Sequence, residues 1–220
     1  MNKKCVFFFL LCAVLALASS CLGASADIVM RADGSGKITL VYRVSQMLES
    51  LGRLDGNEDW PAIPVGRADF ERSLARIPGL RLASYSAKET RNASGSGDLV
   101  TKAVAEFKNT AALLAFLDRT GSRAALVQEN GKNTLRLILL DSPPPIADRD
   151  LLSLIKEISA GYEISFSLSA PKNASLSVQP SSVPSARIVQ QGKKVSFAIG
   201  LGELLTLENG LVIEMEWDKN

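Results

Sequence analysis

Three short turn motifs, each between segments of alternating apolar and polar residues, constrain the fold of this chain more than any other feature. They occur at residues 33–36 (Asp-Gly-Ser-Gly), 130–131 (Asn-Gly) and 191–192 (Gln-Gly). Glycine and asparagine adopt positive φ angles easily, so such motifs between alternating runs predict tight β-hairpins. The predicted strand pairs are 27–33 with 37–44, 123–129 with 133–140, and 186–190 with 193–199.

Further alternating segments predict more strands, and apolar residues at helical spacing predict helices between them. The additional strands are predicted at 80–91, 98–107, 161–170 and 211–217. The helices are predicted at 45–52, 68–77, 109–117 with Asn109 as its cap, and after Asp148. Residues 53–66 and 171–185 read as irregular loops. This order predicts an α+β fold, in which an antiparallel sheet built from hairpins has helices packed on one face.

The N-terminal segment has the layout of an export signal. Lys3 and Lys4 form a short positive start, and residues 5–18 form an uncharged apolar run. That run is shorter than the roughly 20 residues of a membrane-spanning helix, and small residues follow it. The predicted division is a signal peptide over 1–20, a lipidated Cys21 with a short flexible tether over 21–26, and a single α+β envelope domain over 27–220.

Residues 17–21 (Leu-Ala-Ser-Ser-Cys) resemble a lipobox, the cleavage site of bacterial lipoproteins. This resemblance implies that the signal is cut before Cys21 and that the cysteine thiol carries a lipid. Ala18 stands where the usual pattern has leucine. The alternative is that ordinary signal peptidase cuts after Ala26, which would release a soluble periplasmic protein. Because the C-terminal residues carry no apolar span, we expect any membrane anchor to come from the N-terminus.

Residues 27–44, with the predicted helix at 45–52, resemble the opening of the LppM-type family of bacterial envelope lipoproteins. The matching elements are a first strand, an Asp-Gly-Ser-Gly turn, a second alternating strand and a helix. The layout of residues up to about 140 is similar as well. The resemblance implies an envelope surface domain with lipid or glycolipid contact, and it supplies no catalytic residue.

The composition disfavours several classes of function. The chain has 25 basic and 23 acidic residues, and removal of Lys3 and Lys4 would leave 23 of each. A neutral chain is a poor ligand for nucleic acid, which is bound through clustered Lys and Arg. The sequence contains no histidine, which is the commonest general base and metal ligand, and its three cysteines all lie within residues 1–21. We therefore expect no enzymatic activity, no cofactor and no metal site.

Few residues stand out as ligand-binding or catalytic candidates. Trp60 lies in a proline-rich loop and is a weak candidate for gripping a ligand or entering a lipid interface. Residues 55–59 begin like a calcium loop, but Trp60 replaces its glycine and Gly66 its final glutamate, so we read a solvated acidic loop. Ser169 and Lys172 could form a nucleophile–base pair, although their spacing does not recommend it.

The sequence thus predicts a membrane-anchored, non-enzymatic envelope lipoprotein that binds a lipid, glycan or protein partner. The expected location is the cell envelope, with the domain facing the periplasm or the cell surface. Two alternatives remain. One is a soluble periplasmic enzyme that uses carboxylates, such as a glycan hydrolase. The other is a passive structural component of an envelope complex. Outward-facing Ser165, Ser167 and Ser196 predict a wettable open face on the sheet.

Overall fold

The computed structural model describes residues 22–45, 66–91, 97–118, 120–141, 149–159, 161–180, 183 and 185–219. The strands of its larger sheet are β1 (Leu22–Met30), β2 (Gly36–Ser45), β3 (Leu80–Arg91), β4 (Gly97–Phe107), β7 (Glu163–Ser169), β9 (Arg187–Gln191) and β10 (Lys194–Gly200). Those of its smaller sheet are β5 (Ala124–Glu129), β6 (Lys132–Leu140), β8 (Ala174–Gln179) and β11 (Leu211–Asp218). The helices in these ranges are α3 (Arg67–Ala75), α4 (Thr110–Leu117), α5 (Arg149–Ile158) and α6 (Leu201–Leu205).

Strand β1 lies at the centre of the larger sheet, whose order is β3-β4-β2-β1-β7-β10-β9. It pairs antiparallel with β2 and parallel with β7, and the other neighbours in this sheet are antiparallel. The smaller sheet has the order β5-β6-β11-β8, so the last strand of the chain lies between two earlier ones. Neither the parallel pair nor this insertion follows from the local sequence pattern.

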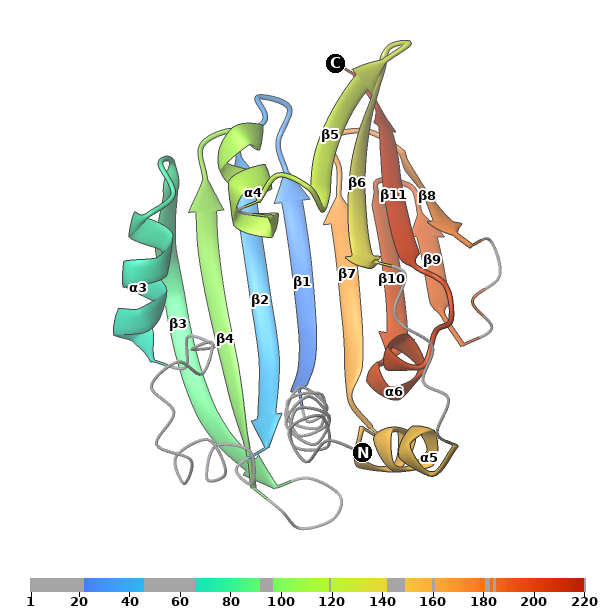
Figure 1. The fold of residues 1–220 in the computed structure, drawn as a ribbon. Coiled ribbons are helices and arrows are strands. Elements are labelled where there is room, and N and C mark those ends of the chain that lie inside the picture. Colours follow the sequence, from blue (N-terminus) through green and yellow to red (C-terminus); the bar gives the residue numbers. More distant parts are fainter. Residues whose placement is uncertain are drawn as a thin grey trace, which may run out of the picture.

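The two sheets and the helices α3, α4 and α6 contribute to one buried core. Figure 1 shows the smaller sheet lying over β7 and β10, with α3 and α4 on the same side of the larger sheet. We call the apolar side chains between these layers the main core. Its fully buried members include Ile28, Ile38, Leu135, Leu168, Val195, Phe197, Leu211, Ile213 and Met215. On β11, one face is buried and consists of Leu211, Ile213, Met215 and Trp217.

A second, smaller group of buried side chains lies beneath α3. Phe70 of this helix stacks against Tyr42, with ring centroids 5.9 Å apart, and also contacts Tyr85 at 5.7 Å. Ala103 completes the buried part of the group. We call these four residues the aromatic cluster. Because α3 packs on the edge strand β3, this cluster is covered by a helix and not by the smaller sheet.

Local sequence chemistry accounts for the hairpin turns and for one helix start. Asn130 and Gly131 adopt φ angles of 51° and 76°, as a two-residue turn between β5 and β6 requires. The Asn109 side chain accepts a hydrogen bond from Ala112 N at 2.9 Å, so its predicted role as the cap of α4 is confirmed. These elements were predictable because their causes lie within a few residues.

Gly36, at the start of β2, is required by close packing. A Cβ atom added there would lie 2.0 Å from the carbonyl oxygen of Val29 and 2.4 Å from the Phe107 ring. Since the obstacles are backbone and a fully packed ring, a side chain at this position would force the strands apart. The last glycine of the turn motif therefore serves packing between β1, β2 and β4.

Several predictions need correction. Residues 22–26, predicted as a flexible tether, form the first half of β1. The expected single antiparallel sheet covered by helices is instead a mixed α+β fold of two sheets, and much of the covering layer is strand. Residues 171–185 are not all loop, because they contain β8. The serines in this strand made its alternation of apolar and polar residues hard to recognise. Residue 45 ends β2, and the remainder of the helix predicted at 45–52 lies outside the described residues.

Candidate functional site

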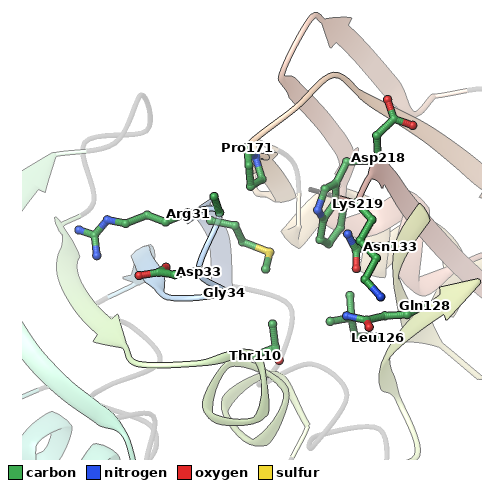
Figure 2. A pocket seen from close by; sticks show the side chains of 13 residues that line it. Arg31, Asp33, Gly34, Thr110, Leu126, Gln128, Asn133, Pro171, Asp218 and Lys219 are labelled. Atoms are coloured by element: carbon green, nitrogen blue, oxygen red, sulfur yellow. The ribbon is translucent and has the colours of Figure 1, made fainter. Parts of the chain in front are cut away.

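A cavity of about 330 Å³ opens at the end of the molecule where both sheets meet the β1–β2 turn. We call it the mouth pocket. Figure 2 shows turn residues on one side and residues of β5, β6 and the end of β11 on the other, with Pro171 and Thr110 between them. The lining residues are Met30, Arg31, Ala32, Asp33, Gly34, Thr110, Leu126, Gln128, Asn133, Pro171, Trp217, Asp218 and Lys219.

The β1–β2 turn forms one rim of the mouth pocket and is held by its own hydrogen bonds. Asp33 Oδ1 accepts from Ser35 N at 2.9 Å and from Ser35 Oγ at 2.7 Å, and Arg31 Nη1 donates to Ser35 Oγ at 3.2 Å. The hydrogen bonds from Ser35 lower the pKa of Asp33 below its ordinary value of 3.8. This carboxylate is therefore ionised and committed to the turn, which fixes the shape of the rim.

The floor of the mouth pocket is built by a cross-strand pair of the smaller sheet. Trp217 of β11 lies directly opposite Asn133 of β6, and both side chains point towards the main core. Their exposed fractions are 4% and 8%, and that of neighbouring Met30 is 6%. Among the described residues, no hydrogen bond is formed by the Asn133 amide or by the Trp217 indole N–H. Neither group is fully enclosed, so both reach the pocket surface.

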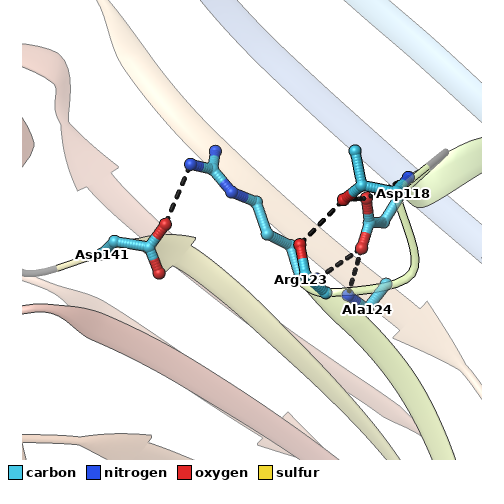
Figure 3. Close-up of polar contacts among 6 residues, drawn as sticks. Asp118, Arg123, Ala124 and Asp141 are labelled. Atoms are coloured by element: carbon cyan, nitrogen blue, oxygen red, sulfur yellow. Dashed lines mark hydrogen bonds and ion pairs between the residues drawn. The ribbon is translucent and has the colours of Figure 1, made fainter.

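The wall contributed by β5 is positioned by a network around Asp118, at the end of α4 (Figure 3). Asp118 Oδ1 accepts from Thr120 N at 2.8 Å and from Thr120 Oγ1 at 2.6 Å. Its Oδ2 accepts from the backbone N–H groups of Arg123 and Ala124, the two residues that lead into β5. The chain is thus guided from α4 into the strand that carries Leu126 and Gln128.

The same network has a clear electrostatic consequence. Hydrogen bonds from the Thr120 side chain and from the Arg123 backbone hold the pKa of Asp118 far below its ordinary value of 3.8. The Arg123 side chain also pairs with Asp141 at 2.9 Å, but both of these side chains are mostly exposed. The Asp118 carboxylate is consequently ionised at neutral pH and acts as an acceptor for the loop, not as a proton donor.

The centre of the larger sheet's face that points away from the main core carries mostly small or hydroxyl side chains. We call this face the open face. Its central, half-buried residues are Ser25, Asp27, Thr39, Val41, Ser165, Ser167, Ser169, Ser196 and Ala198. The predicted outward placement of Ser165, Ser167 and Ser196 is confirmed, since they alternate with buried Leu168 and Phe197.

Acidic groups on the open face are engaged by neighbouring basic groups. Lys37 lies 3.3 Å from Glu106, which Arg81 also contacts, and Lys194 lies 3.9 Å from Asp27. Near the start of β1, Asp98 is fully buried and lies 3.6 Å from Arg43. The Tyr162 hydroxyl donates to Asp98 at 3.4 Å. These ion pairs link strands of the larger sheet, and their geometry does not mark any one carboxylate as catalytic.

The structure places only some of the candidates from the sequence. Cys21, Trp60 and the calcium-like loop at 55–59 lie outside the described residues. Ser169 lies on the open face, whereas Lys172 donates to the Lys219 carbonyl at 2.7 Å, so this lysine is engaged elsewhere. Within the described ranges, no group of three or more acidic or cysteine side chains could hold a metal ion. Likewise, none of the helices in those ranges is long and apolar enough to cross a bilayer.

Comparison with known proteins gives a structural likeness but no sequence match. No protein-family model and no curated protein sequence matches this chain. Among solved structures, the chain is similar to the folded domain of the LppM protein of Mycobacterium tuberculosis, determined by NMR. The sequences are 10% identical, the match covers 90% of this chain and 91% of that chain, and the TM-score is 0.45. No residue role is transferred from this likeness.

The pocket residues were not identified from the sequence. Trp217 belongs to an alternating strand, but its cross-strand partner Asn133 lies 84 positions earlier and has no distinguishing local pattern. Gln128 looked like an ordinary exposed strand residue. The single usable signal was a polar Asn at an inward position of an alternating strand, because a buried amide normally needs a hydrogen-bond partner.

Proposed function

We propose that this protein is a lipid-anchored, non-enzymatic envelope protein that presents a ligand-binding domain. Cys21 carries the lipid, the domain faces the periplasm or the cell surface, and the mouth pocket is its ligand site. The proposal combines the lipobox-like residues 17–21 with one structural observation, namely that β1 begins at Leu22.

The position of β1 supports cleavage before Cys21 over cleavage after Ala26, the two sites that the sequence left open. Cleavage after Ala26 would remove the first five residues of the central strand. It would unpair β2 over the register from Leu22↔Val44 to Ala26↔Leu40, and β7 over three further positions. Cleavage before Cys21 leaves both ladders complete. Since buried backbone groups need hydrogen-bond partners, the structure favours processing at Cys21.

The length of β1 supports a pocket that lies far from the proposed anchor. Leu22 and Met30 are the two ends of β1, and Met30 lines the pocket. At about 3.3 Å per residue, these ends are roughly 26 Å apart. A domain held at Cys21 therefore carries its pocket at the opposite end of the central strand, where it is accessible to a partner in the envelope.

The carboxyl groups whose pKa changes are resolved act as hydrogen-bond acceptors, which suits a binding role. A glycan hydrolase needs a carboxylic acid whose pKa is raised so that it can donate a proton. In the described residues, the carboxyl groups with resolved pKa changes are Asp33, Asp69, Glu106 and Asp118, and all four are lowered by hydrogen bonds. Only Asp33 of these lines the mouth pocket, and Ser35 already holds it.

The anchor is tested by metabolic labelling with a palmitate analogue, followed by membrane fractionation. Wild type and the matched control Cys12→Ala should both be labelled and recovered with membranes, because Cys12 lies in the removed signal. Cys21→Ala should lose the label. Equal labelling of Cys21→Ala, or a mature wild-type protein that begins at Asp27 in the soluble fraction, would contradict the proposal.

A further inference from the structure

We propose that the mouth pocket binds a small neutral saccharide, with a sugar ring lying along its apolar wall and hydroxyl groups meeting Asn133, Gln128 and the Trp217 N–H. This inference names the ligand class of the site proposed above. It rests on the domain being a binding domain, but it does not depend on lipidation of Cys21.

The first argument is the state of two buried polar groups. Trp217 and Asn133 are more than nine-tenths buried, yet neither side chain forms a hydrogen bond within the described part of the chain. Because both groups reach the pocket surface, their hydrogen-bonding capacity is available to a ligand at one place. A ligand with hydroxyl groups would supply an acceptor to the indole N–H and both donors and acceptors to the amide.

The second argument is charge. The ionised side chains around the pocket are Arg31 and Lys219 against Asp33 and Asp218, so the positive and negative charges balance. Asp33 is committed to Ser35, and Arg31 also donates to Ser35. The groups that remain for a ligand on the floor and the β5 wall are amides and an indole. These groups suit an uncharged ligand. Arg31 and Lys219 at the rim form no ion pair with a described carboxylate, so a phosphate is the alternative ligand that the test below separates.

The third argument is shape. Met30, Leu126, Pro171 and the Trp217 ring provide apolar surface beside the amide groups. A sugar ring has a matching arrangement, with C–H groups on its face and hydroxyls at its edge. The volume of about 330 Å³ lies at the lower end of the range of about 300–1,000 Å³ for small-molecule pockets. An extended peptide is the other alternative, because β5 is an edge strand of the smaller sheet, and the test below therefore includes a peptide.

Tryptophan fluorescence gives a direct test, since the chain contains only two tryptophans. In the mature protein carrying Trp60→Phe, Trp217 is the sole reporter. Two disaccharides are titrated separately: cellobiose, which has no acetamido group, and N,N′-diacetylchitobiose, which has two. We expect a saturable change in Trp217 emission with at least one of them. Glucose 6-phosphate and a neutral tripeptide should bind at least about tenfold more weakly, a difference within reach of one hydrogen-bonded or charged contact.

Variants then locate the binding. Asn133→Ala should weaken saccharide binding by about tenfold, and Gln128→Ala by about threefold. Gln191→Ala, an exposed strand glutamine outside the pocket, should leave affinity unchanged. Gln128 is exposed, so its variant keeps the test valid if Asn133→Ala folds poorly.

Three results would overturn the inference: no saturable change with either saccharide, tighter binding of the phosphate or the tripeptide, or full affinity in Gln128→Ala together with folded Asn133→Ala. Any of these results with normal labelling of Cys21 would contradict only the ligand class and leave the proposed anchor standing. Loss of labelling in the wild type with normal saccharide binding would contradict the anchor and leave the ligand class standing.

Discussion

The main core and the aromatic cluster are both buried, but they are covered and filled in different ways. The main core lies between two sheets and contains almost only aliphatic and aromatic carbon. The aromatic cluster lies under one short helix. It contains the buried Tyr42 hydroxyl, and the buried Thr101 hydroxyl lies next to it. We infer that the main core contributes most of the folding free energy and fixes the shape of the mouth pocket. The aromatic cluster contributes less to stability.

The two hydroxyls illustrate the difference. Tyr42 and Thr101 are directly opposite each other on β2 and β4. They are near enough to interact, but neither has a hydrogen bond of normal geometry. Burial raises the pKa of Tyr42 well above its usual range. Buried polar groups without good partners cost stability, so this region contains a penalty that the main core avoids.

The largest expected effect is in the main core. Phe197 is fully buried between the sheets, and Phe197→Ala should lower the free energy of unfolding by about 3–5 kcal/mol. Urea denaturation followed by circular dichroism measures this loss. Val189→Ala on the exposed edge strand β9 is the control and should change stability by less than about 0.5 kcal/mol. A similar loss of unfolding free energy in both variants would contradict the central role of the main core.

Phe70→Ala should have the next largest effect, and it should act locally. The change removes the ring that α3 places between Tyr42 and Tyr85, which costs about 3 kcal/mol by analogy with other buried phenylalanines. Hydrogen exchange should show lost protection in α3 and β3 but retained protection in β10. Uniform loss across both regions would mean that the two halves unfold as one unit.

Thr101→Val should be neutral or stabilising by up to about 1 kcal/mol. Valine has nearly the same shape and removes a buried hydroxyl that lacks a good partner. Tyr42→Phe is the companion variant, with the same expected sign. Thermal melting of both variants checks the idea. A loss of more than about 1 kcal/mol in either would show that the hydroxyl pair stabilises the fold.

The smallest effect concerns the loop that leads into the pocket wall, and it depends on pH. The folded-state pKa of Asp118 is lowered, so its contribution to stability is present above its ordinary pKa of 3.8 and is lost as pH falls through that value towards the folded-state pKa. Asp118→Asn should therefore lower the melting temperature at pH 7 more than at pH 3. The exposed Asp141→Asn is the control and should show little difference. A penalty independent of pH would contradict the electrostatic account.

Elements with local causes could be predicted from the sequence. The turns at 33–36, 130–131 and 191–192, the Asn109 cap and the inward face of β11 all follow from residues near each other in the chain. The division into two sheets could not be predicted in this way. It depends on β1 meeting β7 in parallel and on β11 entering between β6 and β8, pairings between segments about 140 and 80 residues apart.

The candidate site was harder to predict because it has no motif. The mouth pocket is formed by the turn near residue 33, the strand near residue 128 and the chain end near residue 218, which meet only in the folded protein. Its most informative residue, Asn133, differs from other strand asparagines only through burial. The serines of the open face, by contrast, were predictable from alternation alone.

The central position of β1 has a mechanical consequence. If Cys21 holds the lipid, any force that pulls the protein from the bilayer acts on the N-terminal end of β1. Because this strand is hydrogen-bonded on both sides, to β2 and to β7, the load runs along two ladders and shears many bonds together. An edge strand would instead peel away one bond at a time. The acyl chains should therefore leave the bilayer before the domain comes apart.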